Sequence, residues 1–334
     1  MKIVCKKSDC TVAETGVCLL NNSPDTCPER ILSDVGASVS ESADTSKPPL
    51  SAPERNPRFA SSLTLTPDAI REACSGRIFR LVGILGAPDA GKTATLVSLY
   101  LLLCRDKLVG LQFADSMSLM AFDEISRGAR QWNHGHPPEQ MTNHTEIPDD
   151  RTAGFLHLRL RERTSDTRHD VLLSDLPGEW STALIDSNRV DRLEFLKAAD
   201  VIWVMIDGRQ LIETQTRQQV LHRTEVLMGR LSKFLGANAP PVFVVISHKD
   251  SGDPSQASLG RLESEAAKLN LSITIVQVAS FSDNDKVAPG TGIEELIEIS
   301  LKSASSASPS ALWPDQGVGE FNRQFLNFRA GELE

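Results

Sequence analysis

The sequence has no long hydrophobic run and no excess of positive charge. Its longest apolar stretch, residues 96–104, is interrupted by Ser98 and is far too short to cross a bilayer. The N-terminal residues, MKIVCKK, lack the apolar region of a secretory signal. The formal net charge is −9 at pH 7, whereas a broad surface for nucleic acid or anionic membranes would need to be basic. We therefore expect a cytoplasmic protein that binds neither nucleic acid nor membrane.

Cysteine is scarce after the first 27 residues. Only Cys74 and Cys104 lie beyond them, and the other four are Cys5, Cys10, Cys18 and Cys27. Without a secretory signal, metal ligation by thiolates is a better interpretation than disulfides. A zinc ion bound by these four side chains would fold a segment too short to have an apolar core. Because the spacing C-x4-C-x7-C-x8-C lacks a close C-x2-C pair, four reduced cysteines in a tail remain the alternative.

Composition divides the chain into four parts. Residues 1–30 are the candidate zinc module, and residues 31–65 are rich in Ser, Ala and Pro, which predicts a flexible linker. Thr66-Pro67 is a helix-start signal, and from residue 66 to 304 apolar strands alternate with helical segments. This alternation predicts an α/β domain with a mainly parallel sheet. Residues 305–334 are interpreted as a second linker and an aromatic tail.

Apolar runs give the expected strands and helices of this domain. Residues 155–161 and 171–175 are predicted to form a hairpin, whereas 201–207 and 242–247 have the continuous apolar composition of buried parallel strands. The other expected strands are 78–85, 108–113 and 273–279, and the main helices are 93–104, 116–132, 211–235, 256–269 and 293–302. The composition of residues 133–153 predicts a long loop, and loops of this length are usually functional or mobile. We interpret its His134 and His136 as solvated rather than bound to a metal.

One stretch carries a strong signal for phosphate binding. Residues 86–93, GAPDAGKT, fit the pattern G-x-x-x-x-G-K-[ST] and lie between a strand-like run and a helix-forming run. Backbone N–H groups at the helix start would surround phosphate oxygens, Lys92 would reach the β- and γ-phosphates, and the Thr93 hydroxyl would bind Mg²⁺. The alternative, a glycine turn with a surface lysine, is disfavoured by this context. We predict a nucleoside triphosphate site whose further loop contacts are Gly86, Asp89, Ala90, Gly91 and Ala94.

A second motif on the phosphate side is Asp175-Leu176-Pro177-Gly178, which ends an apolar strand about 80 residues later. Asp175 can hold the Mg²⁺ hydration shell opposite Thr93. The backbone N–H of Gly178 can approach a γ-phosphate and move when that phosphate leaves. A simple Pro-Gly turn is the alternative, but the position after a phosphate loop favours a nucleotide site.

Two later strand ends predict contacts to the base. Asp250, in the segment Ser247-His248-Lys249-Asp250, can accept hydrogen bonds from the N1–H and N2–H₂ edge of guanine. Adenine has no such donor pair, so Asp250 would select GTP. At Ser280, after the next strand, a backbone N–H can meet the guanine O6. Either segment alone would be interpreted as a polar loop that closes a strand.

These motifs, in this order, resemble those of a Ras-like P-loop GTPase of the TRAFAC clade over about residues 76–303. The resemblance implies a three-layer sandwich with a mostly parallel six-stranded sheet that has one antiparallel strand. It also implies switch loops around residues 133–153 and 178–192, with a Mg²⁺-binding threonine for which Thr152 fits better than Thr145. The cysteine-rich start, Ala114-Asp115-Ser116 and the Asp-Leu-Pro-Gly-Glu segment are similar to bacterial double-GTPases, found in operons thought to serve conflict or defence.

The chain departs from this family pattern at three places. Ser247 and His248 replace the Asn and Lys of N-K-x-D, although His248 can still stack on the base. Glu179 replaces a glutamine that positions water, and a carboxylate beside the γ-phosphate would slow hydrolysis. Residues 105–150 are also longer than usual. Next to Thr152, Arg151 is interpreted as a surface arginine rather than an arginine finger.

We therefore expect a GTP-dependent molecular switch with slow, Mg²⁺-dependent hydrolysis. Lys92 and Mg²⁺ would neutralise the phosphates, and a water near Gly178 and Glu179 would attack the γ-phosphate. A partner protein is expected to bind the cysteine-rich module, the switch loops or the C-terminal tail. One alternative is a nucleotide-loaded structural subunit without useful turnover, which Glu179 favours. Another is an ATPase, which Ser247-His248 suggests.

Overall fold

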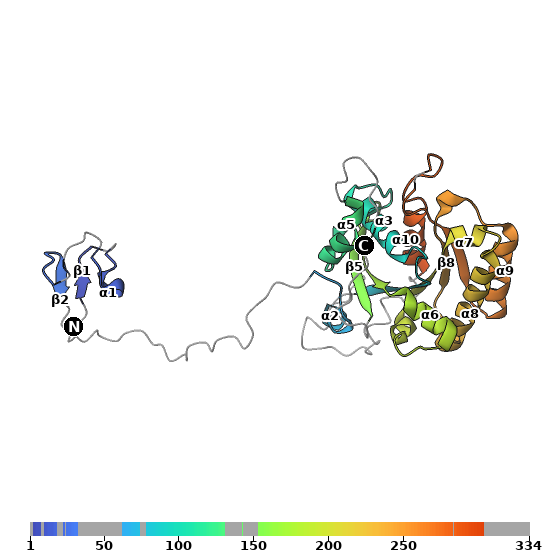
Figure 1. Cartoon of the computed structure of the whole chain (residues 1–334), viewed down its shortest axis with the longest axis horizontal. Coiled ribbons are helices and arrows are strands. Elements are labelled where there is room, and N and C mark those ends of the chain that lie inside the picture. Colours follow the sequence, from blue (N-terminus) through green and yellow to red (C-terminus); the bar gives the residue numbers. More distant parts are fainter. Residues whose placement is uncertain are drawn as a thin grey trace, which may run out of the picture. The chain divides into compact units, whose positions relative to one another are not determined.

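The computed structural model describes residues 3–7, 10–18, 23, 25–32, 62–73, 78–130, 142, 153–282 and 284–303. The chain divides into two units, Met1–Arg58 and Phe59–Glu334, and each is described by itself (Figure 1). In the first unit, β1 (Ile3–Cys5) pairs with β2 (Arg30–Leu32) in an antiparallel ladder. The short helix α1 (Val12–Thr15) lies between them in the chain and ends at a left-handed glycine, Gly16.

Within its described residues, the second unit is built on a mixed sheet of seven strands in the order β4–β5–β6–β3–β7–β8–β9. The strands are β3 (Phe79–Gly86), β4 (Leu111–Asp115), β5 (Gly154–Glu162), β6 (Arg168–Asp175), β7 (Val201–Ile206), β8 (Val242–Ile246) and β9 (Ile273–Gln277). β5 runs antiparallel to both of its neighbours, and every other neighbouring pair is parallel. All residues of β7 and β8 are buried, as their continuous apolar runs predict.

Helices cover both faces of this sheet. They are α2 (Pro67–Ala73), α3 (Lys92–Cys104), α4 (Leu119–Ile125), α5 (Arg127–Arg130), α6 (Gly178–Ser187), α7 (Gly208–Ile212), α8 (Arg217–Leu235), α9 (Gln256–Lys268) and α10 (Ile293–Ser303). Side chains of β7 alternate between two cores: Trp203 packs with α3, α4 and α10, whereas Val204 packs with α6 and α8. The predicted three-layer α/β fold is therefore confirmed. None of the described helices is long and apolar enough to cross a membrane.

The sheet has one strand more than the six that the family resemblance implies, so that number was wrong. Six strands keep the expected arrangement, and β4 is added beside β5 in an antiparallel ladder with a register shift between Phe113 and Asp115. The edge of β5 would otherwise present unpaired backbone groups, and the long segment after α3 supplies the strand that pairs with them. After β4, α4 packs on α3, where Phe122 stacks on Tyr100 with ring centroids 5.3 Å apart.

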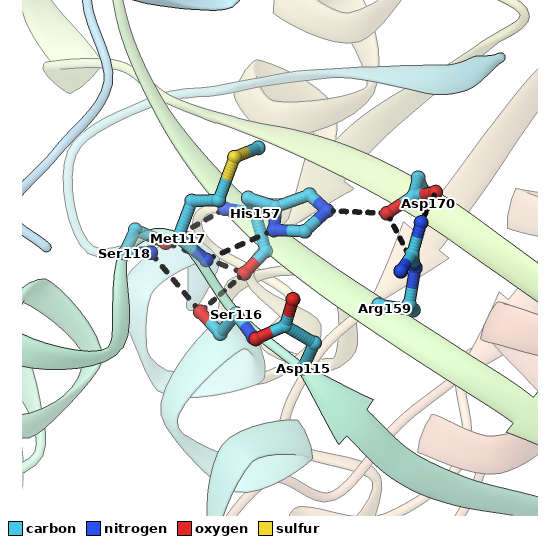
Figure 2. A network of polar contacts seen from close by, with 7 residues as sticks. All are labelled: Asp115, Ser116, Met117, Ser118, His157, Arg159 and Asp170. Atoms are coloured by element: carbon cyan, nitrogen blue, oxygen red, sulfur yellow. Dashed lines mark hydrogen bonds and ion pairs between the residues drawn. The ribbon is translucent and has the colours of Figure 1, made fainter. Parts of the chain in front are cut away.

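A buried polar network joins the turn after β4 to the sheet (Figure 2). His157 on β5 is fully buried, and its Nδ1 accepts a hydrogen bond from the backbone N–H of Met117 at 3.0 Å. Its Nε2 lies 2.9 Å from Oδ1 of Asp170 on β6, and Arg159 donates two hydrogen bonds to the same carboxylate. Burial lowers the pKa of His157, although Asp170 acts in the opposite direction. The ring is therefore neutral and carries its proton on Nε2.

Two long helices expected from the sequence are each divided in the structure. The segment predicted as one helix over residues 211–235 forms α7 and α8. Asp207 caps α7 by accepting a hydrogen bond from the backbone N–H of Arg209 at 2.9 Å, and the chain becomes extended at Glu213. The segment predicted over residues 116–132 likewise forms α4 and α5.

Candidate functional site

The phosphate loop joins β3 to α3 in a tight turn. Asp89 (φ 60°) and Gly91 (φ 88°) both have left-handed backbone conformations. Lys92 is only 8% exposed, and its ammonium donates hydrogen bonds to the backbone oxygens of Gly86 at 2.9 Å and Ala87 at 2.8 Å. The lysine thus lies inside the loop and not on the surface, unlike the lysine of an ordinary glycine turn.

Three carboxylates act on the charge of Lys92. Burial lowers its pKa, and Asp175, Glu179 and Asp89 oppose that effect. An ammonium held by backbone carbonyls in a partly desolvated loop can exchange those acceptors for phosphate oxygens, which form stronger, charge-assisted hydrogen bonds. The local electrostatics therefore suit an incoming polyphosphate accompanied by a cation.

The Asp175–Gly178 segment lies directly against the phosphate loop. Asp175, at the end of β6, is buried, and α6 begins at Gly178. A Cβ at Gly178 would come within 2.4 Å of the backbone nitrogen of Pro88, so only glycine permits this approach. In the first turns of α6, the Ser181 hydroxyl accepts a hydrogen bond from the backbone N–H of Gly86 at 2.9 Å. A close backbone contact and a hydrogen bond thus join two motifs that are far apart in the sequence.

A single cavity of about 630 Å³ contains most of the predicted site residues. They are Asp89, Gly91, Lys92, Thr93, Ala94, Asp175, Gly178, Glu179 and His248. Gly86 and Ala90 line a neighbouring cavity of about 280 Å³ between α6 and α8. The hydroxyl of Thr93 and the carboxylate of Asp175 are oxygen donors of the kind that Mg²⁺ prefers. The lining therefore combines a phosphate cradle with suitable ligands for this ion.

The segment after β8 carries the predicted base-reading residue. Asp250 lies in a short 3-10 helix, Lys249–Ser251, which follows His248 in a left-handed conformation. Its Oδ1 is buried, and among the described residues it has no hydrogen-bond partner. Buried polar atoms are normally paired, so this oxygen suits a ligand that donates hydrogen bonds. The N1–H and N2–H₂ edge of guanine has the required donors.

Ser280 and His248 have partners that the sequence did not predict. The Ser280 hydroxyl shares a 3.1 Å hydrogen bond with Thr95 on α3, so its side chain faces the core. The Nδ1 of His248 shares a 2.8 Å hydrogen bond with the hydroxyl of Ser247. Burial and then the nearby Arg209 lower the pKa of His248, while Asp207 and Asp250 oppose them. The imidazole is therefore largely neutral at pH 7.

Sequence reasoning missed Arg209 and Asp207. Arg209 lines the main cavity, and Asp207, directly after β7, is buried and bound to it. The sequence contains one weak indication of them. The polar segment Asp-Gly-Arg directly follows an apolar strand, at the same edge of the sheet as the other motifs. Thr142 lines the cavity as well. The predicted Mg²⁺ ligand Thr152, its alternative Thr145, and Arg151, His134 and His136 lie outside the described residues.

The N-terminal cysteines, on which the sequence predicts a zinc site, are free thiols in the structure. Cys5, Cys10, Cys18 and Cys27 form no disulfides. A backbone contact at Lys7 lowers the pKa of Cys5, but desolvation and the neighbouring thiols of Cys10 and Cys27 outweigh it and raise the pKa. In the part of the chain that the structure describes, no group of three or more His, Cys, Asp or Glu side chains could hold a metal ion.

Comparison with known proteins gives one family and several distant structures. The family model described as Double-GTPase 2 matches residues 80–302. No curated protein matches the chain. Among solved structures, the signal recognition particle receptor SRb-GTP/SRX complex from Chaetomium thermophilum is 16% identical, with a TM-score of 0.40 over 66% of this chain and 99% of that one. The Arl6 BBS3 small GTPase from Trypanosoma brucei, with bound nucleotide analogue GppNp, is 11% identical, with a TM-score of 0.38 over 69% and 100%. The S. cerevisiae Ski7 GTPase-like domain, bound to GDP and inorganic phosphate, is 11% identical, with a TM-score of 0.40 over 72% and 53%.

Proposed function

The chain belongs to the Double-GTPase 2 family, and we propose that it is a GTP-dependent molecular switch that hydrolyses GTP slowly. The observation that carries this proposal is the shared cavity. Lys92 and Thr93 from one end of α3, and Asp175 and Gly178 from the end of β6, line the same space. These residues bind phosphates and a divalent cation in P-loop proteins.

Mg²⁺ fits the oxygen donors in this cavity. The Thr93 hydroxyl and, through water, the Asp175 carboxylate would hold the ion, with Thr152 as the proposed third ligand. Bound there, Mg²⁺ would neutralise charge on the β- and γ-phosphate oxygens. Lys92 would exchange its hydrogen bonds to loop carbonyls for bonds to the same phosphates. Gly178, packed on Pro88, would sense whether the γ-phosphate is present.

Slow hydrolysis follows from the residue after Gly178. Glu179 lines the cavity and is close enough to Lys92 to influence its pKa. A carboxylate there would be repelled by the γ-phosphate, and it lacks the amide N–H donor with which a glutamine can face the phosphate while it orients the attacking water. We therefore propose a low intrinsic rate. The same residue favours the alternative of a nucleotide-loaded structural subunit without turnover.

Guanine selection rests on Asp250. Its buried Oδ1 suits the donors of guanine, and adenine would leave it without a hydrogen bond. The ATPase alternative depends only on the absence of the usual Asn and Lys before this aspartate.

The biological setting is proposed from the family likeness alone. We propose that the protein acts through a partner protein in a bacterial defence-type system, and that the cysteine-rich module, the switch loops or the C-terminal tail bind this partner. The features that resemble bacterial double-GTPases are the cysteine-rich start, Ala114-Asp115-Ser116 and the Asp-Leu-Pro-Gly-Glu segment.

We also propose that the first unit binds a structural zinc ion. The proximity of Cys5 to Cys10 and Cys27 supports this, because each acts on the charge of Cys5. Their influence raises the pKa of Cys5, so the thiolate ligands would form as Zn²⁺ displaces the protons. Metal analysis of the purified protein should find one zinc per chain. A Cys5→Ser, Cys10→Ser double variant should lose it, whereas Cys104→Ser should not. Protein purified without any zinc would contradict this assignment.

The test of the switch is phosphate release from GTP and from ATP, measured side by side on the full chain. Lys92→Ala is the blank, because it removes the cation that neutralises the phosphates. We expect slow, Mg²⁺-dependent release from GTP alone. Release from ATP would overturn guanine selection. Nucleotide that stays bound without turnover would favour the structural subunit, and a parent protein that binds no triphosphate would overturn the proposal.

A further inference from the structure

The nucleotide cavity contains a second cationic side chain, to which the site described above gives no role. Among the described residues that line the cavity, Lys92 and Arg209 are the strong bases. His248 is largely neutral, because burial and the charge of Arg209 lower its pKa. Lys92 lies within the phosphate loop, so Arg209 is the cation that remains for the rest of the ligand.

Arg209 is held in a defined orientation by Asp207. Its Nε and Nη2 donate to the two carboxylate oxygens at 3.1 Å and 3.0 Å, in a bidentate pair. Asp207 is itself fixed, because its carboxylate also accepts hydrogen bonds from the backbone N–H of Arg209 and from Gln210. Despite this pair, the Arg209 side chain is 54% exposed, whereas that of Asp207 is 6% exposed. The guanidinium is therefore positioned by a buried anchor and still open to the cavity.

Carboxylates from both the phosphate loop and the base-reading segment act on Arg209. After Asp207, the carboxylates that act on its charge are Asp89 in the phosphate loop and Asp250 in the base-reading segment. His248 lies on the same anchor, with its Nδ1 3.4 Å from an oxygen of Asp207. In N-K-x-D the residue at position 248 would be a lysine. Here an imidazole lies at that position, and Arg209 of α7 is bound to the same aspartate, Asp207.

We propose that Arg209 contacts the bound guanine nucleotide and supplies the positive charge that the lysine of N-K-x-D would otherwise bring. This inference rests on the GTP binding proposed above. A guanidinium can stack on a purine plane and donate hydrogen bonds to ribose or phosphate oxygens, which an imidazole without charge does less well. Because Arg209 lines the cavity together with Asp89 of the phosphate loop and with His248 next to the base-reading segment, it would contact the part of the ligand that GTP and GDP share. It is a binding residue and takes no part in the chemical step.

The experiment separates a contact to the nucleotide from support of Asp207. Arg209→Gln removes the cation, and we expect the affinities for labelled GTP and GDP to fall by a similar factor, about 10- to 100-fold. Arg209→Gln also leaves the buried carboxylate of Asp207 without its main partner. A second variant, Asp207→Asn with Arg209→Gln, removes that buried charge and restores a neutral hydrogen-bonded pair. We expect it to regain thermal stability but not nucleotide affinity.

Arg217→Gln is the matched control, because Arg217 donates to the backbone oxygens of Leu211 and Ile212 and does not line the cavity. Its affinities should equal those of the parent. If the double variant binds GTP as tightly as the parent, Arg209 is only a partner of Asp207 and the inference is wrong. Parent-like binding by Arg209→Gln overturns it as well. A parent that binds GTP no better than Lys92→Ala overturns the proposed function itself, and the role of Arg209 with it.

Discussion

Asp250 permits a direct test of guanine selection, because the replacement of one oxygen by an NH₂ group should change the base that the site prefers. Its Oδ1 is buried and unpartnered among the described residues, so a bound base would be its hydrogen-bond donor. Asp250→Asn keeps the shape of the side chain but replaces one carboxylate oxygen with an NH₂ donor. That donor would face the N2–H₂ group of guanine, whereas xanthine presents a carbonyl oxygen at the same position.

The expected size of the effect follows from the two hydrogen bonds involved. A hydrogen bond to a charged group contributes about 1.5–3 kcal/mol, and each 1.4 kcal/mol is about tenfold in affinity. The variant keeps one oxygen for N1–H but loses the bond to N2–H₂, so GTP binding should weaken by at least about 10-fold. XTP should bind the variant about 10- to 100-fold more tightly than it binds the parent, because one neutral pair is restored.

Competition of GTP, XTP and ATP against a fluorescent guanine nucleotide measures all three affinities. Asp253→Asn is the matched control, because Asp253 is an exposed aspartate in the same segment. It should leave the order of affinities unchanged. If Asp250→Asn binds GTP like the parent and gains nothing for XTP, Asp250 does not read the base.

Two further perturbations test the packing around the site and the added strand. Gly178→Ala would place a methyl group within 2.4 Å of the Pro88 nitrogen, so the protein without nucleotide should lose about 1–3 kcal/mol of unfolding free energy in urea. Gly229→Ala on α8, where a Cβ meets nothing within 4 Å, is the control and should be neutral or stabilising; equal stabilities would refute the close packing. His157 has a folded-state pKa below its ordinary value of 6.5, so the unfolded chain binds protons more readily, and stability should be lost as the pH falls below about 6.5. The urea midpoint of the parent should therefore fall between pH 7 and pH 5, and it should fall less steeply in His157→Gln. The control His222→Gln, which changes an exposed histidine, should behave like the parent. Parallel pH profiles for all three proteins would contradict a buried neutral ring.

The parts of the fold and site that depend on short linear patterns could be predicted from the sequence. The strand, loop and helix around Lys92 follow from glycine spacing and two apolar runs, and β7 and β8 follow from uninterrupted hydrophobic residues. The division of residues 211–235 into two helices was not predicted, because the break after Ile212 carries no glycine or proline and only the extended backbone at Glu213 reveals it. The extra strand was named as a segment, but its place in the sheet depends on pairing with β5.

The missed site residue shows a different limit. Arg209 has no motif of its own, and its orientation depends on a carboxylate two residues earlier, while Asp89 and Asp250 from other segments act on its charge. For Ser280, the sequence predicted the position at a strand end but not the direction of the side chain, whose hydroxyl forms a hydrogen bond with Thr95. Sequence spacing indicates which strand ends meet, but the direction of each side chain depends on packing.

The attachment of β4 determines how the domain can be shortened. Deletion of the segment that carries β4 and Met117 would take away the N–H that His157 accepts, and it would uncover the edge of β5. Each buried polar group left unpaired costs about 1–3 kcal/mol, which is a large part of the stability of a typical domain. A minimal version of this protein must therefore replace His157 with an apolar residue that leaves the Arg159–Asp170 pair intact, or keep the added strand. The insertion has become part of the structural core and can no longer be exchanged as a separate module.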